Sequence, residues 1–237
     1  MLQIKNLSKS FGDKLAVDKL SLNVSPGEIW AFIGHNGAGK TTTLKAISGI
    51  IDFDGEIRVN SFNVKTQPFE AKKSLHYIPD NPVLYEHLTG IEQLNFIADV
   101  FLLSQAERKS QIEFYAKRLD LYEVLSQKIS SYSHGMKQKL AILCALIHKP
   151  KLLLLDEPFV GLDPKSSHEL KLIFNELASS GSAIFYSTHV LEVAEKICSH
   201  VAIIKQGKLV CSGTMEKIKG LDSLEKTFLE LEDETSD

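Results

Sequence analysis

The chain has 237 residues, enough for one large α/β domain or two small ones. Its formal net charge of −3 argues against a protein whose main partner is nucleic acid. The three cysteines lie far apart, without the spacing of a zinc site or a disulfide framework, which fits a reducing cytoplasm. The longest apolar run, residues 140–147, is far shorter than the roughly 20 residues that cross a bilayer, and no signal peptide opens the chain.

The first 33 residues predict an antiparallel sheet that leads into a buried strand. Apolar and polar positions alternate over residues 2–32, with turn residues at 11–13 and 25–27. The apolar run at 28–33 then reads as a buried strand. Phe11 stands at the first turn, where a half-buried strand aromatic is the ordinary interpretation.

A glycine-rich loop follows that strand and precedes a helical pattern at 41–49. Its sequence, Gly-His-Asn-Gly-Ala-Gly-Lys-Thr, fits the phosphate-loop pattern, and the strand and helix around it argue against a chance match. The glycines let backbone N–H groups turn inward, and the helix start adds partial positive charge. Lys40 would reach the β- and γ-phosphates, and the Thr41 hydroxyl would bind Mg²⁺. The predicted nucleotide-binding residues are Gly34, His35, Asn36, Gly37, Ala38, Gly39, Lys40, Thr41 and Thr42.

The middle of the chain predicts a helical insertion into an α/β core. Short sheet elements at 55–60 and 74–78 are followed by Pro79-Asp80-Asn81-Pro82, whose two prolines require a rigid loop. Apolar residues then recur at three- and four-residue spacing from residue 88 to about 147. Ser133 is a natural N-cap for an amphipathic helix over 134–148.

Two adjacent carboxylates, Asp156 and Glu157, follow the apolar run 151–155. Such a run suits a central parallel strand, whose carboxyl end faces the ligand edge of an open α/β sheet. Alone, the pair could merely open a solvated loop. Beside a phosphate loop, one carboxylate to hold Mg²⁺ and one to activate water indicate nucleoside triphosphate hydrolysis.

The last third predicts a helix at 165–178, a strand at 183–187 and a hairpin of residues 201–204 and 208–211. His189 follows the strand and so reaches the same sheet edge. We expect one domain over residues 1–221, with a helical subdomain inserted at about 82–147, and a short helix with an acidic tail at 222–237.

Taken together, the motifs resemble those of the nucleotide-binding subunits of ABC transporters, in the same order. They are the phosphate loop, the loop at 78–80, the signature-like segment 132–138, the carboxylate pair with Gly161-Leu162-Asp163 after it, and His189. The resemblance implies a P-loop NTPase core of the α/β class, with a parallel central sheet, an N-terminal antiparallel β subdomain and an inserted α-helical subdomain.

The resemblance also implies roles for individual residues. Phe11 would stack on adenine with Val17 beside it, and Thr41 and Asp156 would serve Mg²⁺. Glu157 would be the general base and His189 would contact the γ-phosphate, so that the expected catalytic residues are Glu157, His189 and Lys40. The ATPase would work as a head-to-tail pair, either a homodimer or a pair with a related subunit. The residues expected to act across that dimer are Ser133, His134, Gly135, Met136 and Asp163.

Four positions depart from the family pattern. Asp80 stands where a glutamine usually contacts Mg²⁺, so either Asp80 serves the metal or the neighbouring Asn81 supplies an amide. His134 and Met136 replace the commoner Gly and Gln of the signature, which leaves the backbone N–H groups in place. His35 occupies a position that is often proline.

The leading hypothesis is an ATP-hydrolysing subunit that powers a separate membrane permease, for export, at the inner face of the cell membrane. Leu84, Tyr85 and Leu88 would line the groove for the permease or pack the insertion's own core. A soluble ABC-type ATPase that regulates the ribosome or a DNA machine is the alternative, although neither a second such domain nor a basic extension is present. A small-molecule P-loop kinase would leave residues 132–138 unexplained.

Overall fold

The computed structural model describes residues 1–220 and 223–233, excluding the side chains of 230–233. Its centre is a six-stranded sheet in the order β10-β9-β3-β8-β7-β6, in which β10 alone pairs antiparallel with its neighbour. The strands are β3 (Ile29–Ile33), β6 (Leu75–Ile78), β7 (Leu152–Asp156), β8 (Ala183–Thr188), β9 (His200–Lys205) and β10 (Lys208–Thr214). The predicted parallel sheet is confirmed.

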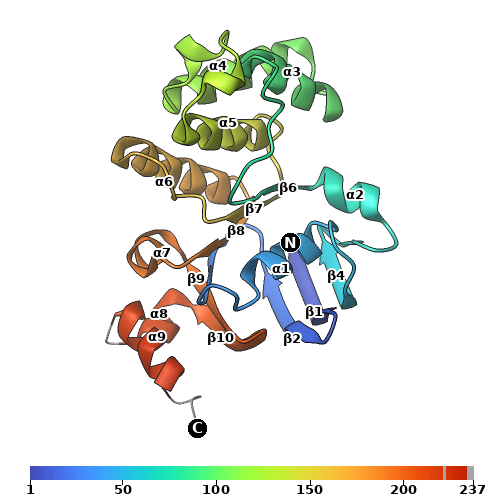
Figure 1. Cartoon of the computed structure of the whole chain (residues 1–237), viewed down its shortest axis with the longest axis vertical. Helices are drawn as coiled ribbons and strands as arrows, with labels where there is room; N and C mark the ends of the chain where they lie inside the picture. Colours follow the sequence, from blue (N-terminus) through green and yellow to red (C-terminus); the bar gives the residue numbers. More distant parts are fainter. Residues whose placement is uncertain (221–222, 234–237) are drawn as a thin grey trace.

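A second, antiparallel sheet lies beside the central one (Figure 1). It has the order β2-β1-β4-β5, with β1 (Leu2–Phe11), β2 (Lys14–Val24), β4 (Asp54–Val59) and β5 (Phe62–Asn63). The turn predicted at residues 11–13 joins β1 to β2, and Phe11 pairs with Lys14 across it. This hairpin therefore delivers Phe11 and Lys14 to one edge of the molecule.

Three helices form the predicted insertion, α3 (Gly90–Val100), α4 (Gln105–Arg118) and α5 (His134–Leu146), with 3₁₀ turns at Tyr122–Val124 and Ile129–Ser131. Figure 1 shows α3, α4 and α5 together at one end of the molecule, away from the antiparallel sheet. Thr89 and Ser104 begin α3 and α4 with capping boxes. The predicted N-cap Ser133 begins α5 by accepting the Met136 N–H at 3.2 Å.

The central sheet separates two hydrophobic cores. Alternate residues of its strands face opposite sides, as the period of a strand requires, so Ala31 and Leu153 join one core and Phe32 and Leu154 the other. The helices around these cores are α1 (Lys40–Ile47), α2 (Pro68–Lys73), α6 (Pro164–Ser179), α7 (Leu191–Ile197), α8 (Met215–Lys219) and α9 (Leu224–Asp233). The acidic tail expected after α9 lies outside the described residues. Over the described ranges, no helix is long and apolar enough to cross a membrane.

Candidate active site

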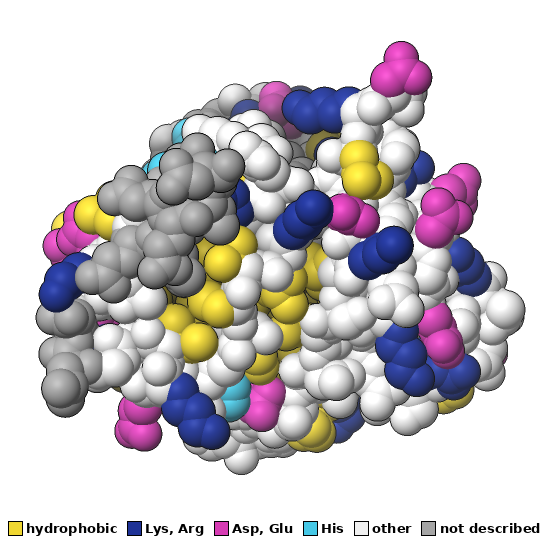
Figure 2. Space-filling model, turned by 90° about the horizontal axis from the view of Figure 1, so that it is seen from below, with side chains coloured by type: hydrophobic (Ala, Val, Ile, Leu, Met, Phe, Trp, Pro, Cys, Tyr) yellow, Lys and Arg dark blue, Asp and Glu magenta, His cyan; other side chains and the backbone are white. Residues whose placement is uncertain are grey.

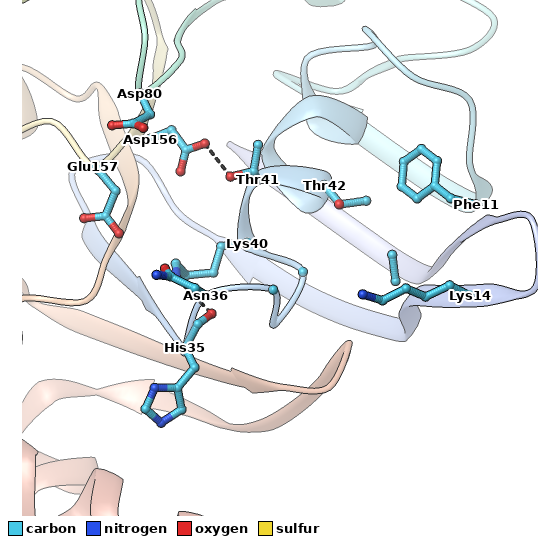
Figure 3. Close-up of a pocket in the computed structure, with 13 residues that line it drawn as sticks. Phe11, Lys14, His35, Asn36, Lys40, Thr41, Thr42, Asp80, Asp156 and Glu157 are labelled. Carbon is cyan, nitrogen blue, oxygen red and sulfur yellow. Dashed lines mark hydrogen bonds between the residues drawn. The ribbon is translucent and has the colours of Figure 1, made fainter.

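A cavity of about 330 Å³ opens where the parallel strands end and the β1–β2 turn approaches them. Figure 3 shows three carboxylates at one side, Phe11 and Lys14 at the opposite side, and the glycine loop between them. Its lining residues are Phe11, Lys14, Ala16, His35, Asn36, Gly37, Gly39, Lys40, Thr41, Thr42, Asp80, Asp156 and Glu157. The cavity thus brings together residues from distant parts of the chain, with a cationic loop between an aromatic ring and a carboxylate cluster.

The glycine loop curls tightly between β3 and α1. A Cβ added to Gly34 would lie 2.4 Å from the Ile204 carbonyl oxygen, and one added to Gly39 would lie 2.6 Å from the Ala16 carbonyl oxygen. Gly39 also has a φ of 109°, a region that side chains rarely adopt. Neither position has room for a side chain, so the curl that turns N–H groups inward depends on glycine.

Lys40 is the buried cation of the loop. Its Nζ donates to the carbonyl oxygens of Gly34 at 2.5 Å and His35 at 3.2 Å. Burial lowers the pKa of Lys40, while the negative charges of Glu157 and Asp156 act in the opposite direction. The ammonium is therefore held at the loop, where a bound phosphate would supply a stronger acceptor than a carbonyl.

Asp156 ends β7 with both carboxylate oxygens engaged. Its Oδ2 accepts from Thr41 Oγ1 at 2.6 Å, and its Oδ1 accepts from Ser187 Oγ. The residue is only 3% exposed. Ser187 is a site residue that the sequence analysis missed, because a single serine near the end of an apolar strand carries no motif. The two hydroxyls fix the carboxylate at the sheet edge.

Glu157 follows in an unusual conformation, with a φ of 51°. Its N–H donates to both the carbonyl oxygen and the Oγ of Ser187 at 3.2 Å. Its Oε1 lies 3.0 Å from Nδ1 of His189, while its Oε2 is buried and has no partner among the described residues. One oxygen is thereby oriented and the other is left as an acceptor, which is the arrangement a general base needs. The strained backbone is typical of functional sites.

Phe11, at the aromatic end of the cavity, is more exposed than its position at the end of a strand suggested. Phe11 is 52% exposed, and Lys9 Nζ lies 5.1 Å from its ring centroid. Val17, expected beside adenine, is instead fully buried and packs against Gly39, while Ala16 and Lys14 line the cavity. An exposed ring beside a phosphate loop is suited to base stacking.

The signature-like segment lies outside this cavity. None of residues 133–136 is among the described residues that line the cavity. This segment packs on the loop after Glu157, because a Cβ added to Gly135 would lie 2.8 Å from the Gly161 carbonyl oxygen. Asp163 caps α6 by accepting hydrogen bonds from the hydroxyl and the N–H of Ser166. These hydrogen bonds, together with the ion pair to Lys139, hold the pKa of the Asp163 carboxyl well below its usual value.

The fold and the site together define a P-loop nucleoside triphosphatase. A family model described as "ABC transporter" matches residues 17–160. The chain belongs to this family, as an ATP-binding ATPase subunit.

Known relatives agree over most of the chain. The linearmycin resistance ATP-binding protein LnrL of Bacillus subtilis (strain 168) is 35% identical over 215 residues, which are 90% of this chain and 69% of LnrL. The ABC transporter ATP-binding protein NatA of the same organism is 33% identical, over 92% of this chain and 91% of NatA. A solved structure, titled as an ATP-binding subunit of an ABC transporter, is 36% identical with a TM-score of 0.94 and covers 98% of this chain and 99% of the other.

Proposed function

We propose that this chain drives a separate membrane permease by closing head to tail over ATP with a second copy or a related subunit. The observation that carries the proposal is the separation of the signature segment from the chain's own nucleotide cavity. Lys40 and Glu157 line that cavity, whereas the N-terminus of α5, with Ser133 as its cap, does not. A second protomer would supply that helix start, whose N–H groups and positive dipole end suit a γ-phosphate.

Mg²⁺ fits the oxygen donors at the carboxylate side of the cavity. Thr41 and Asp156 are already joined by a hydrogen bond of 2.6 Å, and Asp80 lines the cavity beside them. Hydroxyl and carboxylate oxygens are the ligands that this hard cation prefers. The ion would neutralise charge on the β- and γ-phosphates when bound. These three residues would hold it, while Glu157 would take a proton from the attacking water and His189 would orient Glu157.

The roles of Asp80 and Asn81 can be distinguished by the Mg²⁺ dependence of the ATPase activity of variants at each position. Asp80 lines the cavity, whereas Asn81 is exposed and is not among its described lining residues. We expect Asp80→Ala to raise the Mg²⁺ concentration for half-maximal ATPase activity by about 10-fold, because one oxygen ligand is lost. Asn81→Ala is the matched control and should change that Mg²⁺ concentration less than about 2-fold. The opposite ranking in an Mg²⁺ titration would assign the role to the Asn81 amide.

Exposed apolar side chains around the helical insertion support a docking site for the permease. Val83 and Tyr85 are 92% and 50% exposed, and Phe96 stacks edge-on to Tyr85 with ring centroids 5.5 Å apart. Leu84 and Leu88 instead pack partly buried against the core. The exposure of Tyr85 supports a contact with a partner helix, whereas the partial burial of Leu84 and Leu88 supports a role in packing the insertion.

The partner is tested by fractionation of cell extracts. We expect the wild type to sediment with membranes and to copurify with an integral membrane protein. Tyr85→Glu should release it while ATP binding is retained, because a charge would be buried at the interface. Leu172→Glu, an exposed position on α6, is the control. Recovery with ribosomes or nucleic acid would favour the alternative function in a macromolecular machine.

Export is the direction that the relatives favour. LnrL is named for resistance to linearmycin, which would suit removal of a compound from the cell. One face of the molecule, at the end that carries the C-terminal elements, gives little support to a nucleic-acid partner. Figure 2 shows the face with the C-terminal elements, where Lys and Arg side chains are interspersed with Asp and Glu around a hydrophobic centre. We place the chain in the cytoplasm, held at the membrane by the permease.

A further inference from the structure

Gln138 is a buried residue of α5 whose side-chain amide has no hydrogen-bonding partner in the described part of the chain. The residue is 1% exposed, and both its Oε1 and its Nε2 are buried and unpaired. An amide offers two donors and an acceptor oxygen. Leaving it unpaired in the interior destabilises the folded state, and native proteins keep few such groups. A partner supplied in another state of the protein would offset that cost.

Gln138 lies on the face of α5 that meets the loop after Glu157. Gly135 and His134 stand three and four positions before Gln138, so all three share one face of α5. Both of the earlier residues meet Gly161: a Cβ on Gly135 would lie 2.8 Å from its carbonyl oxygen, and a Cβ on Gly161 would lie 2.7 Å from His134 Cδ2. Helical side chains generally lean toward the N-terminus of their helix, which is the side of Gln138 on which this contact lies.

The loop itself shows strain and an unpaired group. Its first residue, Glu157, has a φ of 51°, and its Oε2 is buried without a partner among the described residues. The loop ends at Asp163, which Lys139 of α5 contacts at 3.1 Å. Helix α5 thus touches the loop at two points, with an unsatisfied amide on the helix and an unsatisfied carboxylate oxygen on the loop. Such strained and unpaired groups cluster where a protein changes conformation.

We propose that Gln138 is a positioning residue for hydrolysis, whose amide pairs with backbone groups of residues 158–162 when ATP closes the site. The inference rests on the proposed function, because closure places the first turn of α5 on the partner's γ-phosphate. That movement brings Gln138 and the loop into hydrogen-bonding contact and holds Glu157 in the geometry for proton abstraction. Contact between α5 and the partner's γ-phosphate thereby sets the position of Glu157 in the same protomer.

The test is Gln138→Met, which keeps an unbranched side chain of similar length and removes both polar ends. The Tm of the nucleotide-free protein should rise by about 2 to 8 °C, because two unpaired buried groups are lost. The kcat for ATP should fall about 5- to 30-fold, with KM changed less than about 2-fold. A purely structural role would not raise stability and lower the rate together.

Gln93→Met is the matched control, because Gln93 is also a buried glutamine, on α3, but is paired. Its Oε1 accepts the Tyr85 N–H at 3.2 Å, so this variant should lower Tm. A lower Tm for Gln138→Met as well would show that its amide is already paired, and would overturn the inference. An unchanged kcat would do the same while leaving the proposed function intact. Absence of ATP hydrolysis by the wild type would contradict the proposed function and the inference together.

Discussion

Glu157→Gln is expected to lower the rate of ATP hydrolysis by about 10²- to 10⁴-fold while ATP binding persists. The substitution keeps the shape of the side chain, and an amide can still pair with His189, 3.0 Å from Oε1 in the wild type. The amide cannot, however, accept a proton from water at the position that the buried Oε2 occupies in the wild type. The measurement is steady-state phosphate release by the purified protein, with nucleotide affinity determined separately.

The same variant should accumulate a dimer with bound ATP. If hydrolysis opens the pair by removing the γ-phosphate, a protein that binds but does not hydrolyse remains closed. Sizing with and without Mg-ATP detects that species. Glu192→Gln changes an exposed carboxylate in the first turn of α7 and is the control, with rate and sizing like the wild type. Hydrolysis by Glu157→Gln at the wild-type rate would place the general base elsewhere.

Lys40→Met is expected to weaken ATP binding by about 30- to 1000-fold, because a buried cation that pairs with phosphate is removed. The methionine keeps most of the aliphatic stem. What the nucleotide-free protein loses is the pair of hydrogen bonds to the Gly34 and His35 carbonyl oxygens, so its fold should persist. Titration calorimetry with ATP and Mg²⁺ measures the change in affinity.

Lys45→Met provides the comparison for Lys40, since it removes a cation from the last turn of the same helix, outside the described cavity lining. It should leave ATP affinity within about 2-fold of the wild type, because Lys45 is not among the described residues that line the cavity. Equal losses in the two variants would mean that overall charge, and not the contact made by Lys40, governs binding.

The sequence predicted those parts of the site that a local pattern defines. The glycines of residues 34–39 and the prolines around Asp80 restrict the backbone itself, so their positions follow without knowledge of the tertiary contacts. The long helices and the buried strands also appear as regular apolar periods. Helices α2, α7 and α8 were missed because five to seven residues hold too little of a helical period to be seen.

Other features depend on packing that no local pattern contains. Val17 and Ala16 are neighbours on a strand, and the sheet register decides which of them faces the cavity. The positive φ of Glu157 is uncommon for a residue other than glycine, and two contacts with Ser187 of the next strand hold it. The unpaired state of Gln138 likewise depends on what surrounds the residue.

The measurement that tests the shared site most directly is the ATPase rate of an equimolar mixture of Lys40→Met and Ser133→Asp. Each variant alone should be inactive: the first lacks its phosphate contact, and the second keeps a cap for α5 but places a carboxylate where the helix start would meet the partner's γ-phosphate. In a mixed head-to-tail dimer, one site combines both defects and the other is intact. With random pairing, half of the dimers are mixed, so the account predicts about a quarter of the wild-type rate. A mixture no more active than its separate components, although mixed dimers form, would contradict a site shared between two protomers.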